Sequence, residues 1–340
     1  MMKRRTTGRI PVLPYTNHHY GSKAVYRPWD YEYDPKEDTF TCKLPTNSKE
    51  DNVDKDKIIA EYEKNKREII ALQDKFYADG REGLIVVIQA LDASGKDSVI
   101  KYVFSGMNPQ GVKVHYYKAP TSDELAHDYL WRINQNIPRR GEIAVFNRSH
   151  YEDLVTVQVE DIWQGYHMSE RVLDDTKKEF FDKRCEQVNN YEQYLYENSY
   201  RMVKIFLHVS KEEQMEQLLE RIELPEKNWK FRADDLKVTD KYDSYLKCFN
   251  DVINKTSSKN SPWYVLPGDQ RWYTRYLFAE ILLDALKSCR PEYPALPPAE
   301  AEKLPECRKI LTGALGINGN GENNADAERS SKKTKKKLRK

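Results

Sequence analysis

A short apolar stretch near the end of the first quarter of the chain leads directly into a glycine and a lysine. Residues 84–91 (LIVVIQAL) are apolar and rich in β-branched side chains, which predicts a strand buried on both faces. The next six residues are Asp92-Ala-Ser-Gly-Lys-Asp97, and a helical pattern follows them up to Asn108-Pro109. A buried strand, a tight loop and a helix in this order make up the repeating unit of a parallel α/β sheet.

Four further strands are predicted, at residues 112–117, 142–146, 203–209 and 263–266. Helices are expected between them, at 121–136, at 169–198, after Ser210 and at 269–288, and another precedes the first strand at 54–79 with Gly80 as its stop. Thr121 with Glu124, and Ser210 with Glu213, have the spacing of capping boxes. The pattern predicts an α/β fold with a doubly wound parallel sheet of about five strands.

Three regions follow from the composition. Residues 1–53 contain many tyrosines and little periodicity, which indicates an extended arm, and residues 54–290 form the α/β domain. Residues 291–340 change from Pro-rich to Gly/Asn-rich to Lys-rich, which predicts a disordered tail.

Hydropathy and cysteine usage indicate the cellular compartment in which the protein is expected. The mean hydropathy is −0.85 and no apolar run approaches the length of a membrane span. The basic start is not followed by the apolar stretch of a signal peptide, and the five cysteines form no CxxC pair. We expect a cytoplasmic protein with free thiols and without a zinc site.

The net charge of +2 conceals a polarised distribution. Residues 1–9 hold four Lys/Arg and residues 329–340 hold eight, with no acid in either segment, so residues 10–328 carry a net charge of −10. A polyanion that binds the body of the protein therefore needs locally arranged cations.

The loop after the first strand resembles a P-loop, in which backbone amides and a lysine hold phosphate oxygens. Gly95 and Lys96 fit the motif G-x-x-x-x-G-K-[ST], whereas Ala90 stands at its first glycine and Asp97 at its hydroxyl residue. The alternative is an ordinary turn with a surface lysine.

The strand at 142–146 ends in Asn147-Arg148-Ser149, where P-loop enzymes place a residue that holds Mg²⁺. Because Asn147 is neutral, the charge of a metal has to be met by Asp92, Glu152 or Asp153. Arg148 is placed to brace a transferring phosphoryl group. The alternative for Arg148 is a surface ion pair with Glu152, four residues further on.

Basic residues follow the fourth strand, where nucleotide kinases have a mobile lid. We expect this lid at about 215–240, with cations able to close over phosphates at Arg221, Lys227, Lys230 and Arg232. The alternative is a solvated helix end.

These motifs resemble the second polyphosphate kinase family. The similar segments run in order from about residue 54 to 286 and include residues 89–97 (QALDASGKD), 108–112 (NPQGV), 127–132 (HDYLWR), 141–153 (GEIAVFNRSHYED), 229–230 (WK) and 262–265 (PWYV). The resemblance implies a P-loop kinase fold with a helical lid, and Mg²⁺-dependent phosphoryl transfer between inorganic polyphosphate and nucleotides, with Mn²⁺ as an alternative ion.

The resemblance also implies roles for individual residues. Asp92 and Lys96 match the acid and lysine of the family's P-loop, Arg148 its catalytic arginine and Arg221 a basic lid residue. Asn147 and Glu152 resemble the subgroup that accepts both nucleoside mono- and diphosphates. Ala90 replaces a glycine that is usual in the family, and Ser98 replaces a small residue that is commonly glycine.

The expected site contains three sets of residues. The catalytic set is Asp92, Lys96, Arg148 and Glu152; the phosphate- and polyphosphate-binding set is Ser94, Gly95, Lys96, Asp97, Lys101, Arg132 and Arg140, with Arg139 as a further channel cation; the metal set is Asp92, Asn147 and Glu152. The expected partners are polyphosphate, adenine and guanine nucleotides and further copies of the chain, with no membrane and no specific nucleic acid.

Two other functions compete. The first is an ATP-dependent nucleotide or small-molecule kinase on the same fold, which needs no extended cationic channel. The second is a nucleic-acid-binding protein that uses the Lys-rich tail and has a lapsed P-loop. We further expect the tail to recruit long polyphosphate.

Overall fold

A five-stranded sheet, all of whose strands are parallel, forms the centre of the computed structural model, which describes residues 31–34, 39–42, 44–49 and 53–317. The strand order is β4-β5-β3-β6-β7. The strands are β3 (Gly83–Gln89), β4 (Val112–Tyr116), β5 (Ile143–Asn147), β6 (Tyr200–His208) and β7 (Trp263–Pro267). The predicted fold class and the five predicted strands are confirmed.

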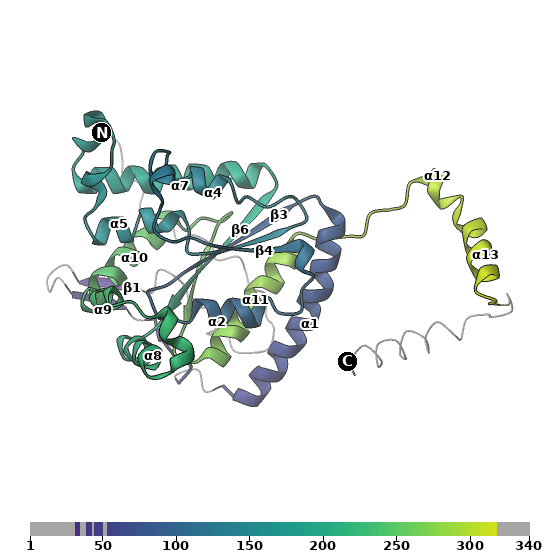
Figure 1. Cartoon of the computed structure of the whole chain (residues 1–340), viewed down its shortest axis with the longest axis horizontal. Helices are drawn as coiled ribbons and strands as arrows, with labels where there is room; N and C mark the ends of the chain where they lie inside the picture. Colours follow the sequence, from purple (N-terminus) through teal and green to yellow (C-terminus); the bar gives the residue numbers. More distant parts are fainter. Residues whose placement is uncertain (1–30, 35–38, 43, 50–52, 318–340) are drawn as a thin grey trace, which may run out of the picture. The chain divides into compact units, whose positions relative to one another are not determined.

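Helices cover both faces of this sheet (Figure 1). On one side lie α1 (Lys55–Asp79), α2 (Lys96–Val103) and α11 (Arg271–Ser288); on the other lie α7 (Lys177–Glu197) and α10 (Tyr242–Thr256). Every residue of β3, β5 and β7 is buried, which explains why their sequences are continuously apolar rather than alternating. The edge strand β4 is partly exposed.

The connections contain short helical segments. These are α3 (Ser122–Leu125), α4 (Trp131–Asn134), α5 (Thr156–Val159), α6 (Glu170–Leu173), α8 (Lys211–Glu223) and α9 (Asp234–Asp240), with the 3-10 helices η2 (Pro109–Gly111), η3 (His150–Asp153), η4 (Trp163–Gly165) and η5 (Pro225–Lys230).

Several predicted helix boundaries are confirmed. Gly80 ends α1 in the left-handed region (φ 67°), and its N–H donates to the Phe76 carbonyl. Thr121 and Glu124 form a complete capping box at α3, and the Ser210 hydroxyl caps α8 by accepting from the N–H of Glu213.

Two long helices were predicted wrongly as continuous. The stretch 121–136 is broken between α3 and α4, because the Asp128 carboxylate accepts from the N–H of Leu130 and holds a turn there. The stretch 169–198 is broken between α6 and α7, where Thr176 and Glu179 form a capping box that starts α7 afresh.

The N-terminal arm is described only in part, and residues 1–30 lie outside the described residues. Strands β1 (Tyr31–Asp34) and β2 (Thr39–Cys42) pair as an antiparallel ribbon. Leu44 is buried in the main core, and Ser48 donates from its backbone to the side chain of Gln270 at 3.0 Å. The segment 44–49 therefore packs on the α/β domain.

The C-terminal residues from Pro294 onward form a separate unit. Within it lie α12 (Pro298–Ala301) and α13 (Leu304–Ala314), so the prediction of disorder is wrong for this stretch. Apolar residues at Leu304, Leu311 and Leu315 recur at helical spacing, which favours the helix. Residues 318–340, with the Lys-rich segment, lie outside the described residues. In the described part of the chain no helix has the length and apolar character needed to cross a membrane.

Candidate active site

The loop between β3 and α2 turns through two residues in the left-handed region. Ala93 has φ 60° and Gly95 has φ 78°. Glycine adopts this conformation without steric cost, whereas alanine does so at a cost of about 1 kcal/mol. The helix begins at the next residue, Lys96. The loop therefore has the strand–turn–helix context that the sequence predicted for a P-loop.

Lys96 folds back over this loop. Its side chain is buried, with 8% of the residue exposed, and Nζ donates to the carbonyls of Ala90 and Leu91 at 2.9 and 2.8 Å. Burial, together with the nearby guanidinium of Arg148, lowers the pKa of Lys96 to about 8. The interpretation of Lys96 as an ordinary surface lysine is wrong.

Arg148 joins the P-loop to the turn that follows β5. Its guanidinium donates to the Asp92 carboxylate and, at 3.2 Å, to Glu152 Oε2. Burial raises the pKa of Asp92, but Arg148 and then Lys96 outweigh burial and hold the pKa of this carboxyl below its usual value. The predicted Arg148–Glu152 ion pair exists, and Arg148 is in addition bound to the loop.

Asp97 connects the P-loop to the lid. Its Oδ1 accepts from Asn147 Nδ2 at 2.9 Å, and its Oδ2 pairs with Lys230 Nζ at 2.8 Å. Burial raises the pKa of Asp97, and the hydrogen bonds from Lys230 and Asn147 lower it further than burial raises it. A residue of η5, more than 130 positions away in the chain, thus touches the first turn of α2.

The rest of the predicted lid forms its own ion pairs. Arg221 Nη1 donates to Asp235 Oδ2 at 2.9 Å, and Lys227 Nζ pairs with Glu220 at 2.5 Å. The segment predicted as a lid is helical, with α8, η5 and α9 over most of 211–240. Among its predicted cations, Lys230 contacts the loop directly.

Three predicted phosphate-binding residues are not brought into this cluster. Lys101 lies on α2 with its ammonium 5.9 Å from the ring centre of Tyr102. Arg132 donates to the Lys118 carbonyl at 2.9 Å, near the carboxyl end of β4.

Arg140 lies at the amino end of the strands, opposite to the end that carries the P-loop. It precedes β5, whereas Arg148 follows it, and a five-residue strand spans about 16 Å. The Arg140 guanidinium donates to the Asn198 carbonyl, just before β6, so Arg140 lies at the other end of β5 from the P-loop, and Arg139 precedes the same strand. The expected role of Arg139 and Arg140 in a polyphosphate channel stays a prediction.

Two glutamines that the sequence analysis gave no role hold the site. Gln214 on α8 donates to the Asp92 carbonyl at 2.9 Å. In the orientation that suits its neighbours, the amide nitrogen of Gln89 donates to Glu152 Oε1 at 2.9 Å and its oxygen accepts from the Ser149 N–H. No short motif marks these positions, although Gln89 directly precedes the P-loop.

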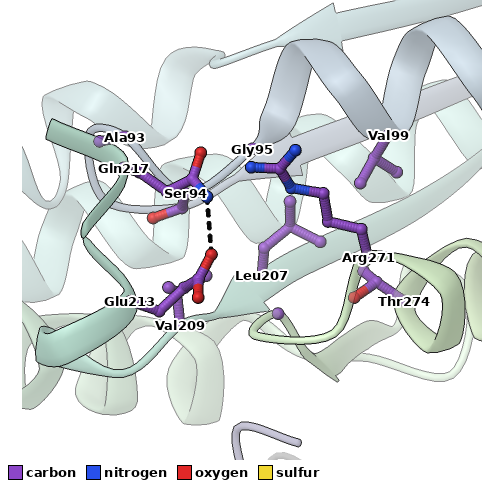
Figure 2. Close-up of a pocket in the computed structure, with 11 residues that line it drawn as sticks. Ala93, Ser94, Gly95, Val99, Leu207, Val209, Glu213, Gln217, Arg271 and Thr274 are labelled. Atoms are coloured by element: carbon purple, nitrogen blue, oxygen red, sulfur yellow. Dashed lines mark hydrogen bonds between the residues drawn. The ribbon is translucent and has the colours of Figure 1, made fainter. Parts of the chain in front are cut away.

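A small pocket lies on the side of the loop that faces α8 and α11 (Figure 2). Ser94 and Gly95 line it together with Glu213, Gln217 and Arg271, and Gln217 donates to Glu213 at 2.7 Å. Arg271 is therefore a cation close to the P-loop that sequence reasoning did not find.

Several oxygen atoms suited to a hard cation lie at this end of the sheet. They are the carboxylates of Asp92, Asp97 and Glu152 and the Asn147 Oδ1, which is buried and has no hydrogen-bond partner. In the described part of the chain, no group of three or more His, Cys, Asp or Glu residues could hold a metal by itself. One or two of these carboxylates with the Asn147 amide oxygen fit a hard divalent cation that completes its shell with water and phosphate oxygens.

Similar proteins share this architecture. The model of the family "Polyphosphate kinase 2 (PPK2)" matches residues 52–294. An ADP-polyphosphate phosphotransferase of Rhodopseudomonas palustris is 42% identical over 71% of this chain and 83% of its own length. An AMP/ADP-polyphosphate phosphotransferase of Meiothermus ruber is 40% identical over 70% of this chain and 84% of its own.

Solved structures agree with these relatives. The crystal structure of polyphosphate kinase 2 from Arthrobacter aurescens TC1 superposes with a TM-score of 0.68 at 30% identity, covering 78% of this chain and 92% of that one. The matched region contains the P-loop, the Arg148 turn and the lid. The chain is an enzyme of the polyphosphate kinase 2 family.

Proposed function

We propose that this enzyme transfers phosphoryl groups reversibly between inorganic polyphosphate and nucleoside mono- and diphosphates, converting AMP to ADP and ADP to ATP. A terminal phosphate oxygen of the nucleotide attacks the terminal phosphorus of polyphosphate, the bond to the penultimate unit breaks, and the chain leaves one unit shorter. Adenine and guanine nucleotides are the proposed acceptors. We place the reaction in the cytoplasm, in a homo-oligomer.

The contact of Arg148 with both Asp92 and Glu152, beside the buried Lys96, carries this proposal. Phosphoryl transfer depends on positioning and on neutralising the equatorial oxygens more than on a strong base. Lys96 and Arg148 provide two fixed cations at the carboxyl end of β3 and β5, and Lys230 provides a third from the lid. Carboxylates hold Arg148 and Lys230, and backbone carbonyls hold Lys96, until phosphate oxygens replace them.

Membership of this kinase family implies a divalent metal ion, and we propose Mg²⁺, with Mn²⁺ as a substitute. Asp92, Glu152 and the unpaired Asn147 Oδ1 are the residues that would hold it. When bound, the ion supplies positive charge to the phosphate oxygens. Asn147 is neutral, so the site holds one carboxylate fewer than a site with Asp at this position.

The test is ATP formation from polyphosphate with Mg²⁺, with ADP supplied in one vessel and AMP in another. We expect ATP from ADP, and ADP followed by ATP from AMP. Lys96→Ala should abolish both, by 10³-fold or on that order, because a fixed cation at the transferring phosphate is lost. Lys113→Ala is the matched control, because Lys113 pairs with Glu142 at the amino end of β5.

Two results would contradict the proposal. If the protein consumes ATP with some other acceptor and is indifferent to polyphosphate, it is an ATP-dependent kinase. If Lys113→Ala loses as much activity as Lys96→Ala, the P-loop lysine has no special role.

A further inference from the structure

The turn after β5 carries two residues of the proposed site, Arg148 and Glu152, and Arg148 has a strained backbone. Arg148 has φ 64°, in the left-handed region, which costs a non-glycine residue about 1 kcal/mol. Such a conformation persists only where the surrounding structure imposes it. On the amino side of the turn the neighbouring strand β3 does so, because the Arg148 N–H donates to the Ile88 carbonyl of β3 at 3.0 Å. The carboxyl side of the turn needs its own anchor.

A fully buried ion pair contacts this turn and is separate from the hydrogen bonds that Arg148 and Lys96 form with the P-loop. Lys204 on β6 is 0% exposed and Glu192 on α7 is 3% exposed, and Lys204 Nζ lies 2.5 Å from Glu192 Oε2. Lys204 also donates to the Thr256 carbonyl at 2.8 Å, and the Ser261 hydroxyl donates to Glu192 Oε2 at 2.7 Å. The pair thus joins α7, β6, the end of α10 and the residues before β7.

Tyr151, in the turn itself, is bonded to both members of the pair. Its hydroxyl donates to Glu192 Oε1 at 2.7 Å and accepts from Lys204 Nζ at 3.0 Å. Its ring is 1% exposed and meets Trp263 edge to face, with the ring centres 4.7 Å apart. The preceding residue, His150, is also buried, with Nε2 3.5 Å from Glu192 Oε1. Two consecutive residues of the turn therefore face one carboxylate.

We propose that the buried Glu192–Lys204 pair positions Arg148 and Glu152 for phosphoryl transfer by fixing the turn between them through the hydroxyl of Tyr151. Tyr151, Glu192 and Lys204 are positioning residues, because none of them is bonded to the P-loop. A gain in stability does not by itself account for the pair, since a buried ion pair contributes little compared with well-packed apolar side chains. A rigid support for a catalytic arginine does account for it.

This inference rests on the proposed function and is tested with a pair of matched variants. Tyr151→Phe removes the hydroxyl that ties the turn to Glu192 and keeps the ring in the core. Ser261→Ala removes another buried hydroxyl bond to the same carboxylate and leaves the turn untouched. Tyr151→Phe loses two hydrogen bonds, one to Glu192 and one from Lys204, whereas Ser261→Ala loses one, so we expect Tm to fall in both variants and further in Tyr151→Phe.

The readout is the division of the effect between kcat and KM in the full-length protein. We expect Tyr151→Phe to lower kcat about tenfold while the KM values for nucleotide and polyphosphate stay within about twofold. Ser261→Ala should keep kcat within about twofold. Loss of kcat in both variants or in neither, or a rise of KM in place of the fall in kcat, overturns the inference.

Failure of the proposed function has a different signature. If the unaltered protein uses ATP as donor and ignores polyphosphate, the proposed donor is wrong. The same two variants are then compared with ATP, because the turn would position Arg148 for either donor.

Discussion

The ammonium of Lys96 is the group whose charge the proposed chemistry depends on most directly. Its pKa is lowered to about 8 by burial and by Arg148, so about half of the free enzyme has lost this charge at pH 8 and most of it has at higher pH. Since kcat/KM reports the ionisation of the free enzyme, we predict that kcat/KM for polyphosphate falls toward tenfold per pH unit above pH 8. Steady-state rates between pH 6.5 and 10 measure this fall, the alkaline limb of the pH profile.

Lys96→Arg is the control for this limb, because a guanidinium stays charged throughout that range. The variant is expected to be slower overall, since its planar fork does not replace a point charge, yet to lack the alkaline fall. An unchanged alkaline limb in Lys96→Arg would assign the limb to another group.

The ionisation of Lys96 should also affect the free energy of unfolding, which should rise with pH whereas kcat/KM falls. A lysine whose pKa is lower in the folded state than in the unfolded state leaves the unfolded chain with more bound protons between pH 8 and 10.5. The contribution of Lys96 to the free energy of unfolding therefore rises with pH across this window. Comparing denaturant midpoints of the unaltered protein and Lys96→Met at pH 7.5 and 9.5 measures it. A difference between the two proteins that is the same at both pH values would contradict the lowered pKa.

The sequence predicted the residues of the site that carry a motif and missed those that do not. Lys96, Arg148 and Asp92 follow strands of recognisable pattern, and they meet because parallel strands end at one edge. Gln214 reaches Asp92 from a helix that begins more than a hundred residues later, and one glutamine on a helix has no pattern of its own. Arg140 precedes its strand and so lies away from the P-loop, and its role in a polyphosphate channel stays a prediction.

Lid and P-loop are joined by one exposed ion pair, Lys230–Asp97, whose side chains are 32% and 57% exposed. Pairs this exposed contribute at most about 1 kcal/mol to stability, so Lys230→Gln should barely change Tm. We predict that it lowers kcat/KM for polyphosphate by about tenfold, because the lid loses the cation that reaches the loop. The loss should shrink as salt rises.

Lys227→Gln is the matched control within η5. Lys227 pairs with Glu220 inside the lid, so this variant removes the same charge from the same segment without touching the loop. We expect a change within about twofold. Equal losses in the two variants would mean that the lid acts by its net charge and not by the contact with Asp97.

Hydrophobic periodicity predicted the helices and strands that are determined by packing against the core. It failed at helix ends that are determined by hydrogen bonds between a single side chain and the backbone. The five strands could be predicted because each has an apolar pattern over at least four residues, either on both faces or on one face. The breaks near Asp128 and Thr176 depend on single side chains that bind the backbone, which a hydrophobic pattern does not record. Thr176 and Glu179 nevertheless have the capping-box spacing, so that break could have been predicted.

Charge is distributed over the chain in a way that opposes its proposed substrate. Residues 10–328 carry a net charge of −10, whereas the last twelve residues hold eight Lys/Arg and no acid. Long polyphosphate carries about one negative charge per unit, so an acidic body repels it outside the cluster of site cations. A flanking basic segment lowers this repulsion in proportion to the number of phosphates it can reach.

We therefore predict that removing residues 318–340 raises KM for polyphosphate of several hundred units by about threefold to tenfold and leaves KM for chains of about ten units unchanged. The kcat value should not change, because the described site lies within residues 84–240. A full-length variant with the eight basic residues of 329–340 replaced by serine separates charge from length. The effect should fade between 0.1 and 0.5 M salt, as the Debye length falls below about 10 Å. An unchanged preference for chain length after truncation would show that the site cations alone capture the polymer.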